Sequence, residues 1–283
     1  MRSFLFVPAG SAKMLEKSLS SSADAVILDL EDAVQLSAKV EARALLAAHL
    51  AARPAGGPKV AVRVNGLATP WNRDDLAAVV PLKPDLVMLP KTQGPADIAE
   101  LADRIAALEP EAGRTEILVV ATETVGSVLS LAAQDWRHPR LRGMLWGGED
   151  LAAELGATAN RNADGAYTSP FRLARDLCLL AARRAGVLAI DAVHTDIRDL
   201  DALAAEAEAA RRDGFDGKAA IHPTQVEVIN AVFRPTEAEI AWAHDVLQAL
   251  ATSASGVAVV AGQMVDAPHA ARARSILGEH RRV

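Results

Sequence analysis

The sequence predicts an α/β fold, a closed (β/α)8 TIM barrel with a C-terminal helical lid extension. Eight short apolar runs recur along the chain, helical segments separate them, and eight such units in about 250 residues match a barrel in both count and size. The runs are mostly apolar at consecutive positions, which is typical of parallel strands covered on both faces. They cover residues 4–9, 25–31, 59–65, 86–90, 117–123, 143–148, 188–193 and 218–223.

The segments between the runs place Leu, Ala or Ile at three- and four-residue spacing, as amphipathic helices do. Strands that alternate with helices imply right-handed βαβ units. An open doubly wound sheet fits the same alternation, but the first strand is not followed by the GxGxxG of dinucleotide-binding versions. The clearest helical segments cover residues 14–20, 38–50, 96–108, 201–214 and 236–252.

The carboxyl-terminal stretch exceeds what eight units need. We expect residues 1–235 to form the catalytic barrel and residues 236–283 to form an extension that folds over a barrel mouth or reaches a neighbouring subunit. The extension contains a helix, an apolar run at 256–268 and a final helix at 269–280. Because no flexible linker precedes it, we do not expect an independent domain.

Composition narrows the class of protein. The 283 residues carry a formal net charge of −6, which argues against a nucleic-acid partner, because such proteins usually have a basic footprint. The single cysteine, Cys178, excludes an intrachain disulfide and fits a reducing compartment. The apolar run near the amino terminus is short for a signal peptide, and no run has the length of a membrane span. These features predict a cytoplasmic protein with no membrane partner.

Charged side chains follow the predicted strands at their carboxyl ends, where barrel active sites lie. This distribution indicates that the chemistry gathers at one end of the barrel. The residues are Asp29, Glu31, Asp32, Arg63, Lys91, Glu123, Glu149, Asp150 and His222.

Two of these acids, Glu123 and Asp150, end apolar runs beside small residues. A buried acid is costly without a partner, and two converging carboxylates are sufficient protein ligands for Mg²⁺, which fills its octahedron with waters and substrate. The alternative is that each acid interacts with the dipole of a following helix, worth about 0.3–1 kcal/mol. That alternative suits Asp150 better than Glu123, because a helical segment starts directly after Asp150.

Three basic or titratable residues have both structural and functional interpretations. Arg63 interrupts an apolar run and needs an anionic partner, either an acid of the DLED segment or a ligand. His222 precedes a proline and could serve structure or catalysis equally. Lys13 follows a Gly-Ser turn and could hold a phosphate, or could be an ordinary solvated lysine.

Several motifs occur together and in order. They are RSFLFVPA (2–9), DAVILDLEDAV (24–34) with Lys39 and Arg43 downstream, VRVNG (62–66), LVMLPKT (86–92), ETVGSVL (123–129), LWGGEDLAAELGA (145–157), GKAAIHPTQVEVIN (217–230) and GQMVDAPHAARA (262–273). In these motifs the chain resembles the citrate lyase β-subunit-like proteins of the HpcH/HpaI aldolase superfamily, which include malyl-CoA and citramalyl-CoA lyases.

The resemblance implies a Mg²⁺-dependent TIM barrel that cleaves or forms a carbon–carbon bond β to a thioester carbonyl. It implies that Glu123 and Asp150 are the metal ligands and that Arg63 stabilises the thioester enolate. It also implies that Asp266 is a lid acid, which in relatives often completes the site of the adjacent subunit in a trimer.

The substrate would be a CoA or acyl-carrier thioester. The resemblance places the carrier arm near Lys13, Arg43 and the HPTQV loop, with Arg63 and Glu123 at the acyl end. One departure is the segment AGSAKML, where relatives often carry a proline and an arginine. A lysine cannot reproduce the bidentate phosphate contact of an arginine.

Three functions follow. The first is a lyase acting on citryl-, malyl- or citramalyl-type thioesters. The second is a malate-synthase-like or acyl-CoA thioesterase activity on the same scaffold, with Asp266 as the base. The third is a non-catalytic subunit that assembles with citrate lyase alpha and gamma subunits. A homo-oligomer, a trimer or hexamer, is expected in the first two cases.

Overall fold

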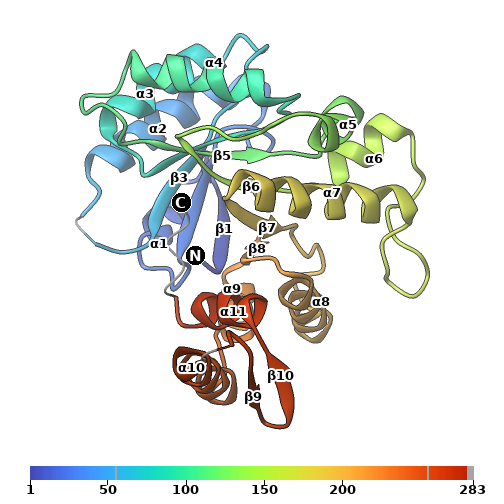
Figure 1. Ribbon diagram of the computed structural model, residues 1–283. Coiled ribbons are helices and arrows are strands. Elements are labelled where there is room, and N and C mark those ends of the chain that lie inside the picture. The colour runs from blue at the N-terminus through green and yellow to red at the C-terminus, as the bar shows by residue number, and fades with distance from the viewer. Residues whose placement is uncertain (55, 254, 279–283) are drawn as a thin grey trace. The chain divides into compact units, whose positions relative to one another are not determined.

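In a computed structural model the eight predicted strands form a closed parallel barrel (Figure 1). The structure describes residues 1–54, 56–253 and 255–278. Each strand pairs with the next in chain order, and β8 pairs back onto β1, with Phe4 beside Ala219. This closure excludes the open sheet. The strands are β1 (Ser3–Pro8), β2 (Ala25–Asp29), β3 (Lys59–Arg63), β4 (Leu86–Leu89), β5 (Glu116–Val120), β6 (Leu141–Leu145), β7 (Leu188–Asp191) and β8 (Gly217–Ala220).

Helices follow the strands and cover the outside of the barrel (Figure 1). Many begin with a cap that the sequence supplies, such as Ser11 before α1, Thr124 before α5 and Asp199 before α8. The α-helices are α1 (Ala12–Ser18), α2 (Lys39–Ala51), α3 (Asn72–Val79), α4 (Pro95–Ala106), α5 (Val125–Ala133), α6 (Glu149–Leu155), α7 (Ser169–Ala185), α8 (Leu200–Asp213) and α9 (Pro223–Val232). Two 3₁₀ turns, η1 (Leu36–Ala38) and η2 (Val80–Leu82), complete this part of the chain.

The strand residues divide between two cores. In β2, Ala25 and Ile27 point into the barrel, and Val26 and Leu28 point out to the helices. Both sets are fully buried, so the strand is apolar at consecutive positions, as the sequence indicated. Cys178 is buried in the outer core, and burial raises the pKa of its thiol, which favours a structural over a nucleophilic role.

The strands end before the predicted runs do. The pairing of β5 with β6 ends at Val120 and Leu145, so Glu123 and Asp150 lie in the segments that follow rather than in the strands. The same holds for Glu31 after β2. Lys91 and Asp150 follow β4 and β6, as the predicted runs 86–90 and 143–148 implied. The polar residues therefore lie on βα loops and helix starts at the carboxyl end of the barrel.

The chain divides into two compact units, Met1–Phe233 and Arg234–Val283. The second contains α10 (Glu237–Thr252), a hairpin of β9 (Ala258–Val260) and β10 (Gln263–Val265), and α11 (Ala267–Ile276). Ala243, Val246, Val265 and Ala273 form its core. The predicted final helix continued to residue 280, and its last two residues lie outside the described part of the chain. The lid function of 236–283, and its dependence on the barrel of 1–235, stay predictions.

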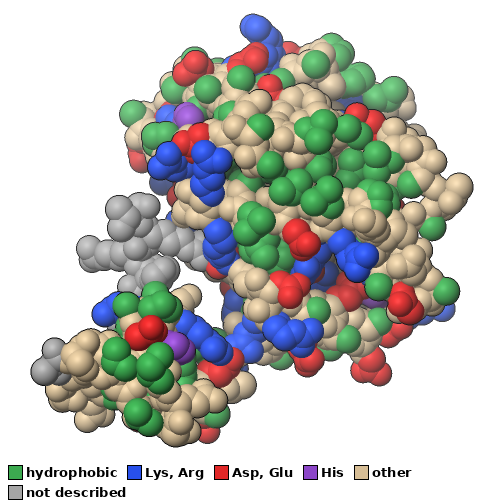
Figure 2. Space-filling model, turned by 45° about the vertical axis from the view of Figure 1, so that its right-hand side comes forward, with side chains coloured by type: hydrophobic (Ala, Val, Ile, Leu, Met, Phe, Trp, Pro, Cys, Tyr) green, Lys and Arg blue, Asp and Glu red, His purple; other side chains and the backbone are tan. Residues whose placement is uncertain are grey.

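On the face shown in Figure 2, acidic and basic side chains are interspersed with apolar ones, and neither kind of charge dominates the surface. None of the helices in the described part of the chain is long and apolar enough to cross a membrane.

Candidate active site

A pocket of about 430 Å³ opens among the carboxyl ends of the strands. The first compact unit supplies its lining, and six of the residues predicted from strand ends are part of it. These are Asp29, Asp32, Arg63, Glu123, Glu149 and Asp150.

Arg63 is fixed by a fork of hydrogen bonds to Asp29. The two residues end β3 and β2 and are direct partners in the sheet register. Arg63 donates from Nε and Nη2 to the two carboxylate oxygens of Asp29, at 2.8 and 2.6 Å, and its Nη1 lies 3.0 Å from Glu31. Burial alone would lower the pKa of Arg63, but the hydrogen bonds and charges of these acids raise it. Arg63 is therefore a permanently charged group of fixed orientation.

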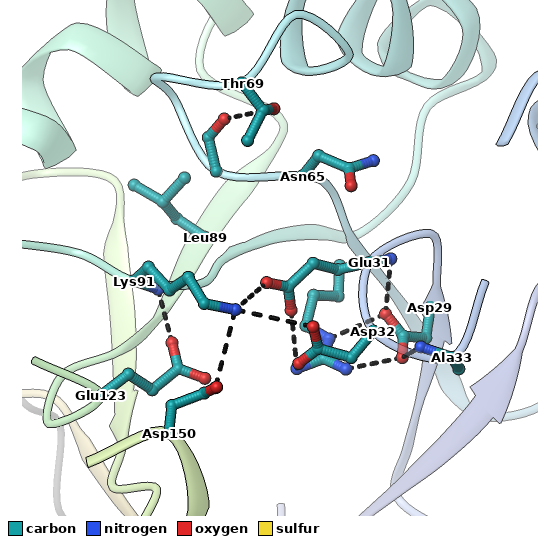
Figure 3. A network of polar contacts seen from close by, with 12 residues as sticks. Asp29, Glu31, Asp32, Ala33, Asn65, Thr69, Leu89, Lys91, Glu123 and Asp150 are labelled. Atoms are coloured by element: carbon teal, nitrogen blue, oxygen red, sulfur yellow. Dashed lines mark hydrogen bonds and ion pairs between the residues drawn. The ribbon is translucent and has the colours of Figure 1, made fainter. Parts of the chain in front are cut away.

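The DLED loop is shaped by its own side chains. Asp29 accepts hydrogen bonds from the backbone N–H groups of Glu31 and Ala33, at 2.9 and 3.3 Å. Lys39, buried at the start of α2, donates from Nζ to the carbonyls of Leu30 and Glu31, at 2.9 and 2.8 Å. These contacts hold Glu31 where it reaches both Arg63 and Lys91. Figure 3 shows its contact with Lys91.

Lys91 joins the acids of the pocket. Its Nζ lies 2.5 Å from Glu31, 3.5 Å from Asp32 and 3.6 Å from Asp150 (Figure 3). Its backbone is left-handed, with a φ of 51°, which is uncommon for a residue with a side chain. This conformation accompanies a hydrogen bond of 2.5 Å from its backbone N–H to Glu123. Burial alone would lower the pKa of Lys91, but Glu31 and the other acids raise it.

Glu123 is buried, and among the described residues no cationic side chain pairs with its carboxylate. Only 6% of the residue is exposed, and its hydrogen bond comes from the Lys91 backbone. Burial raises its pKa to about 8, and the charges of Glu31 and Asp150 act in the same direction. A carboxyl group of this kind gains strongly from a bound cation, because the cation replaces the missing hydration.

The loops that carry Glu123 and Asp150 are fastened to each other. Thr122 donates from Oγ1 to the Gly147 carbonyl at 2.9 Å and accepts from the Gly147 N–H at 2.8 Å. Asp150 lies in the first turn of α6 and is half-buried. Figure 3 shows both carboxylates near Lys91, which contacts Glu123 through its backbone and Asp150 through its ammonium.

The donor set fits Mg²⁺. Within the described ranges, no three His, Cys, Asp or Glu side chains form a group suited to a metal. Glu123 and Asp150 remain as a pair of carboxylates, and Mg²⁺ typically takes one or two carboxylates together with water and substrate oxygens. The buried oxygens of Glu123 and the excess of acids in the lining supply the negative charge that a divalent cation needs.

Three other predicted residues are placed as follows. His222 caps α9, where its ring accepts from the Thr224 N–H at 3.3 Å, so its structural interpretation is supported. Lys13 is exposed on α1 and is not part of the pocket lining. Asp266 caps α11 in the second unit and bonds to His269 at 2.7 Å. The binding and catalytic roles assigned to Lys13 and Asp266 stay predictions.

Arg43, expected near the carrier arm, is held by the buried Asp75. Its Nε lies 2.8 Å from that carboxylate, and only 12% of the arginine side chain is exposed. Because Arg43 of α2 is paired with Asp75 of α3, little of its side chain is accessible to a ligand.

The sequence reasoning missed an aromatic wall of the pocket. Trp146 and Tyr167 both line it and meet edge to face, with ring centroids 4.8 Å apart. Trp146 donates to the buried Asp191 at 2.7 Å, and Asp191 pairs with the buried Lys218, also at 2.7 Å. The available signal was a charged residue in each of two predicted strand runs, Asp191 in 188–193 and Lys218 in 218–223.

Comparisons with known proteins identify the family of the chain. Residues 2–223 match the model of the HpcH/HpaI aldolase/citrate lyase family, and residues 172–281 match that of a C–C bond lyase of the TIM-barrel fold. A (3S)-malyl-CoA thioesterase of Cereibacter sphaeroides is 41% identical, over 98% of this chain and 94% of the relative. A citrate lyase subunit beta-like protein of Mycobacterium tuberculosis is 40% identical, over 97% and 93%.

Solved structures of relatives contain ligands. Protein CitE of Mycobacterium tuberculosis, in complex with magnesium, acetoacetate and coenzyme A, has a TM-score of 0.80 and 37% identity, covering 98% of this chain and 97% of that one. A citrate lyase beta subunit from the same organism, complexed with oxaloacetate and magnesium, has a TM-score of 0.70 and 38% identity, covering 82% and 96%. The chain thus belongs to the HpcH/HpaI aldolase/citrate lyase family.

Proposed function

We propose that this protein is a Mg²⁺-dependent carbon–carbon lyase. It cleaves a malyl-, citramalyl- or citryl-type thioester into an acetyl thioester and a 2-keto acid. The observation that carries the proposal is the juxtaposition, in one pocket, of the buried Glu123, the half-buried Asp150 and the fixed guanidinium of Arg63. The family membership and the magnesium and coenzyme A complexes of relatives support it.

The reaction separates a hydroxyl-bearing carbon from the carbon next to the thioester. The hydroxyl group loses its proton, the carbon–carbon bond breaks, and the electron pair moves onto the thioester as an enolate, which then takes a proton at carbon. Bound Mg²⁺ would act as a Lewis acid and template for the oxygens of the keto-acid fragment, held by Glu123 and Asp150.

Arg63 is suited to stabilise the enolate oxygen. Its charge is permanent, and its plane is set by Asp29 before the substrate binds, so little reorganisation is needed when negative charge develops. Lys91 holds Glu31 and the Glu123 carboxylate in place through separate groups. We assign it a positioning role.

The test is incubation of purified protein and Mg²⁺ with malyl-, citramalyl- and citryl-CoA, followed by detection of glyoxylate, pyruvate and oxaloacetate. We expect acetyl-CoA and a keto acid in equal amounts, and their loss in Glu123→Gln. Glu149→Gln is the matched control, because Glu149 lines the same pocket but bonds to Asn160. Full activity in Glu123→Gln contradicts the proposal.

A thioesterase is the second candidate, and the 41% identical relatives named (3S)-malyl-CoA thioesterase favour it. A thioesterase releases free CoA thiol and a hydroxy acid, whereas the lyase keeps the thioester intact. Thiol release without keto acid identifies the thioesterase.

A malate-synthase-like condensation needs a base to start from acetyl-CoA. If Asp266 is that base, Asp266→Asn abolishes condensation and spares cleavage.

The third candidate function concerns assembly with other subunits. Relatives named citrate lyase subunit beta, such as that of Leuconostoc mesenteroides with 34% identity, favour a subunit of a larger complex. Because the strand-end acids of the lyase site are present, we propose catalysis within a homo-oligomer, a trimer or hexamer. Light scattering of the purified chain, alone and with citrate lyase alpha and gamma subunits, tests this.

A further inference from the structure

The ring of Trp146 packs against the segment 147–150, which we call the metal loop because it carries Asp150. Trp146 follows β6 directly and is fully buried. A Cβ atom on Gly148, the residue before α6, would lie 3.3 Å from Cζ3 of Trp146 and 3.6 Å from Cδ1 of Phe171. The ring therefore leaves no space for a side chain at Gly148. In a close-packed interior, a shift of the ring must displace this backbone and Asp150 with it.

Trp146 is held through its indole nitrogen. Nε1 donates to Oδ1 of Asp191 at 2.7 Å, a short bond of the kind that a charged acceptor makes. Asp191 ends β7, and its direct partner in the sheet register is Lys218 of β8, whose Nζ lies 2.7 Å from Oδ2. Arg175 also donates to Oδ1, from Nε at 3.0 Å. Both oxygens of Asp191 thus accept from fixed donors, which gives its carboxylate one orientation.

The pair of Asp191 and Lys218 is enclosed in the molecule, with 4% and 1% of the two residues exposed. Burial alone would raise the pKa of Asp191, but Lys218 and Arg175 lower it, so the carboxylate stays charged. Removing two charges from water offsets much of their attraction, and apolar residues of similar volume often give equal stability. What this ion pair supplies, and an apolar pair cannot, is a fixed acceptor for the indole of Trp146.

The same group of charges reaches the second ring of the aromatic wall. Tyr167, which meets Trp146 edge to face, accepts a hydrogen bond at its hydroxyl from Nη2 of Arg161 at 2.7 Å. Arg161 pairs with Glu206 at 2.8 Å, and Glu206 lies 3.4 Å from Nζ of Lys218. Both rings are therefore held by their polar atoms, through charges that lie between β7, β8 and α8.

We propose that Asp191, fixed by Lys218, is a positioning residue for the metal loop. It holds the Trp146 ring against Gly148 and thereby determines where the Asp150 carboxylate lies. Asp191 itself touches neither the metal nor the substrate. The inference rests on the proposed Mg²⁺ site, and it adds a connection from β7 and β8 to those that the loops after β5 and β6 make with each other.

Two double variants that differ in the acceptor offered to Trp146 test this. Asp191→Asn with Lys218→Met removes both charges and keeps an oxygen that accepts from the indole, whereas Asp191→Leu with Lys218→Met removes the acceptor as well. Calorimetric titration measures their affinity for Mg²⁺. We expect the asparagine pair to stay within about threefold of the wild type and the leucine pair to lose about 10-fold or more. Equal affinities in the two double variants overturn the inference.

Trp146→Phe and Trp136→Phe repeat the test with single substitutions, should a double variant fail to fold. Both tryptophans are buried in the outer core and donate their indole N–H, that of Trp136 to the Ser130 carbonyl at 3.4 Å. Trp136 is not part of the pocket lining. We expect both variants to lose stability, and Trp146→Phe alone to bind Mg²⁺ about 10-fold more weakly. Wild-type affinity in folded Trp146→Phe contradicts the positioning role.

Hydrogen exchange in the metal-free protein separates this inference from the proposed function. We expect the backbone amides of 147–155 to exchange about 10-fold faster in the leucine pair than in the asparagine pair, and faster in Trp146→Phe than in Trp136→Phe. A wild type that binds no Mg²⁺ defeats the proposed metal site, and the exchange rates still decide the inference. Equal exchange rates within each comparison overturn the inference and leave the metal site standing.

Discussion

Arg63 and Glu123 line one pocket but are held in opposite ways. Arg63 has Asp29 and Glu31 against its guanidinium, whereas the buried Glu123 accepts a hydrogen bond from the backbone N–H of Lys91. The first arrangement keeps Arg63 permanently charged. The second makes the charge of Glu123 depend on pH and on a bound cation, so the two residues respond differently to substitution.

The affinity for Mg²⁺ should depend on pH through Glu123. Because its pKa is about 8, the carboxyl is mostly protonated at pH 6, and a metal must displace that proton. We expect the affinity to rise about tenfold per pH unit between pH 6 and 8 and to level off above. Calorimetry at several pH values measures this, and the slope should disappear in Glu123→Gln. An affinity that is flat with pH in the wild type contradicts the assignment.

The metal-free protein should show the complementary trend in stability. The folded-state pKa of Glu123 is raised above its ordinary value of 4.5. Its contribution to the free energy of unfolding is therefore fully present below pH 4.5 and is lost as the pH rises through about 8. Urea unfolding in EDTA at pH 5 and pH 8, with Glu123→Gln as the reference, measures the difference. If the wild type and Glu123→Gln lose the same stability between pH 5 and pH 8, groups other than Glu123 cause the loss.

Arg63→Lys should separate catalysis from stability. The lysine keeps the charge but loses the fork of hydrogen bonds to Asp29, so we expect kcat to fall by about 10²–10³. Arg63→Met leaves Asp29 buried without its partner and should destabilise the protein by about 3–5 kcal/mol. Steady-state kinetics and urea unfolding measure the two effects.

Arg2→Lys is the control for these substitutions. Arg2 makes the same kind of two-point contact, to Asp24, but lies just before β1 at the opposite end of the barrel. Its replacement should leave kcat unchanged. A comparable loss of kcat in Arg2→Lys would show that the effect at position 63 is not local.

At the scale of elements, the site depends on how β5 and β6 end. Thr122 and Gly147 exchange two hydrogen bonds just beyond the last paired residues of these strands. These two hydrogen bonds, which we call the Thr122–Gly147 clasp, fix the loop of Glu123 relative to the start of α6, which carries Asp150. A metal pair built from two elements needs such a connection, because its geometry must be held to a fraction of an ångström.

Thr122→Val should weaken this connection without changing side-chain volume. Gly147 loses its hydrogen-bond partner, so we expect a loss of about 1–3 kcal/mol in stability and a Mg²⁺ affinity about 10-fold lower. Thr115→Val, at the other end of β5, is the matched control: Thr115 is also buried, and its hydroxyl has no hydrogen-bond partner among the described residues. Equal effects of the two substitutions on Mg²⁺ affinity would contradict the role of the clasp.

The elements also show what sequence can and cannot predict. All eight strands were found, because apolar residues dominate each run and most strand positions are buried. Their ends were not found: Ala121 and Thr122 are as buried as β5 itself, so no change in polarity marks the boundary. Helix α3 was not among the predicted helices, because its buried face includes Asn72 and Asp75 instead of an apolar stripe.

The same reasoning applies to the site. The acids and Arg63 were predictable, because charged residues at the ends of apolar runs are exceptional. The pairing of Arg63 with an acid of the DLED segment was one of the two expectations for it, and the structure shows it. The contact between Lys91 and Glu123 was not predictable, because it depends on a left-handed backbone at Lys91 that no residue type there signals. The aromatic wall was missed because Trp146 and Tyr167 meet only in the folded chain.

For the whole molecule, the two compact units divide the predicted catalytic groups. The first contains Arg63, Glu123 and Asp150, and the second contains Asp266. If Asp266 serves an adjacent subunit, two inactive variants should complement each other. Mixed oligomers of Glu123→Gln and Asp266→Asn chains then form about one intact site in four, and activity in condensation returns on mixing.

Complementation has a simple control. Mixing Glu123→Gln with Asp150→Asn chains should restore nothing, because both residues belong to one barrel. Activity that returns in this control, or that fails to return in the first mixture, contradicts the sharing of Asp266 between subunits.

The most direct test of the account is titration of Mg²⁺ into the wild type and three variants at pH 8. We predict one site per chain in the wild type and in Glu149→Gln, and an affinity at least about tenfold lower in Glu123→Gln and in Asp150→Asn. Equal affinity in all four proteins would contradict the claim that these two carboxylates hold the metal.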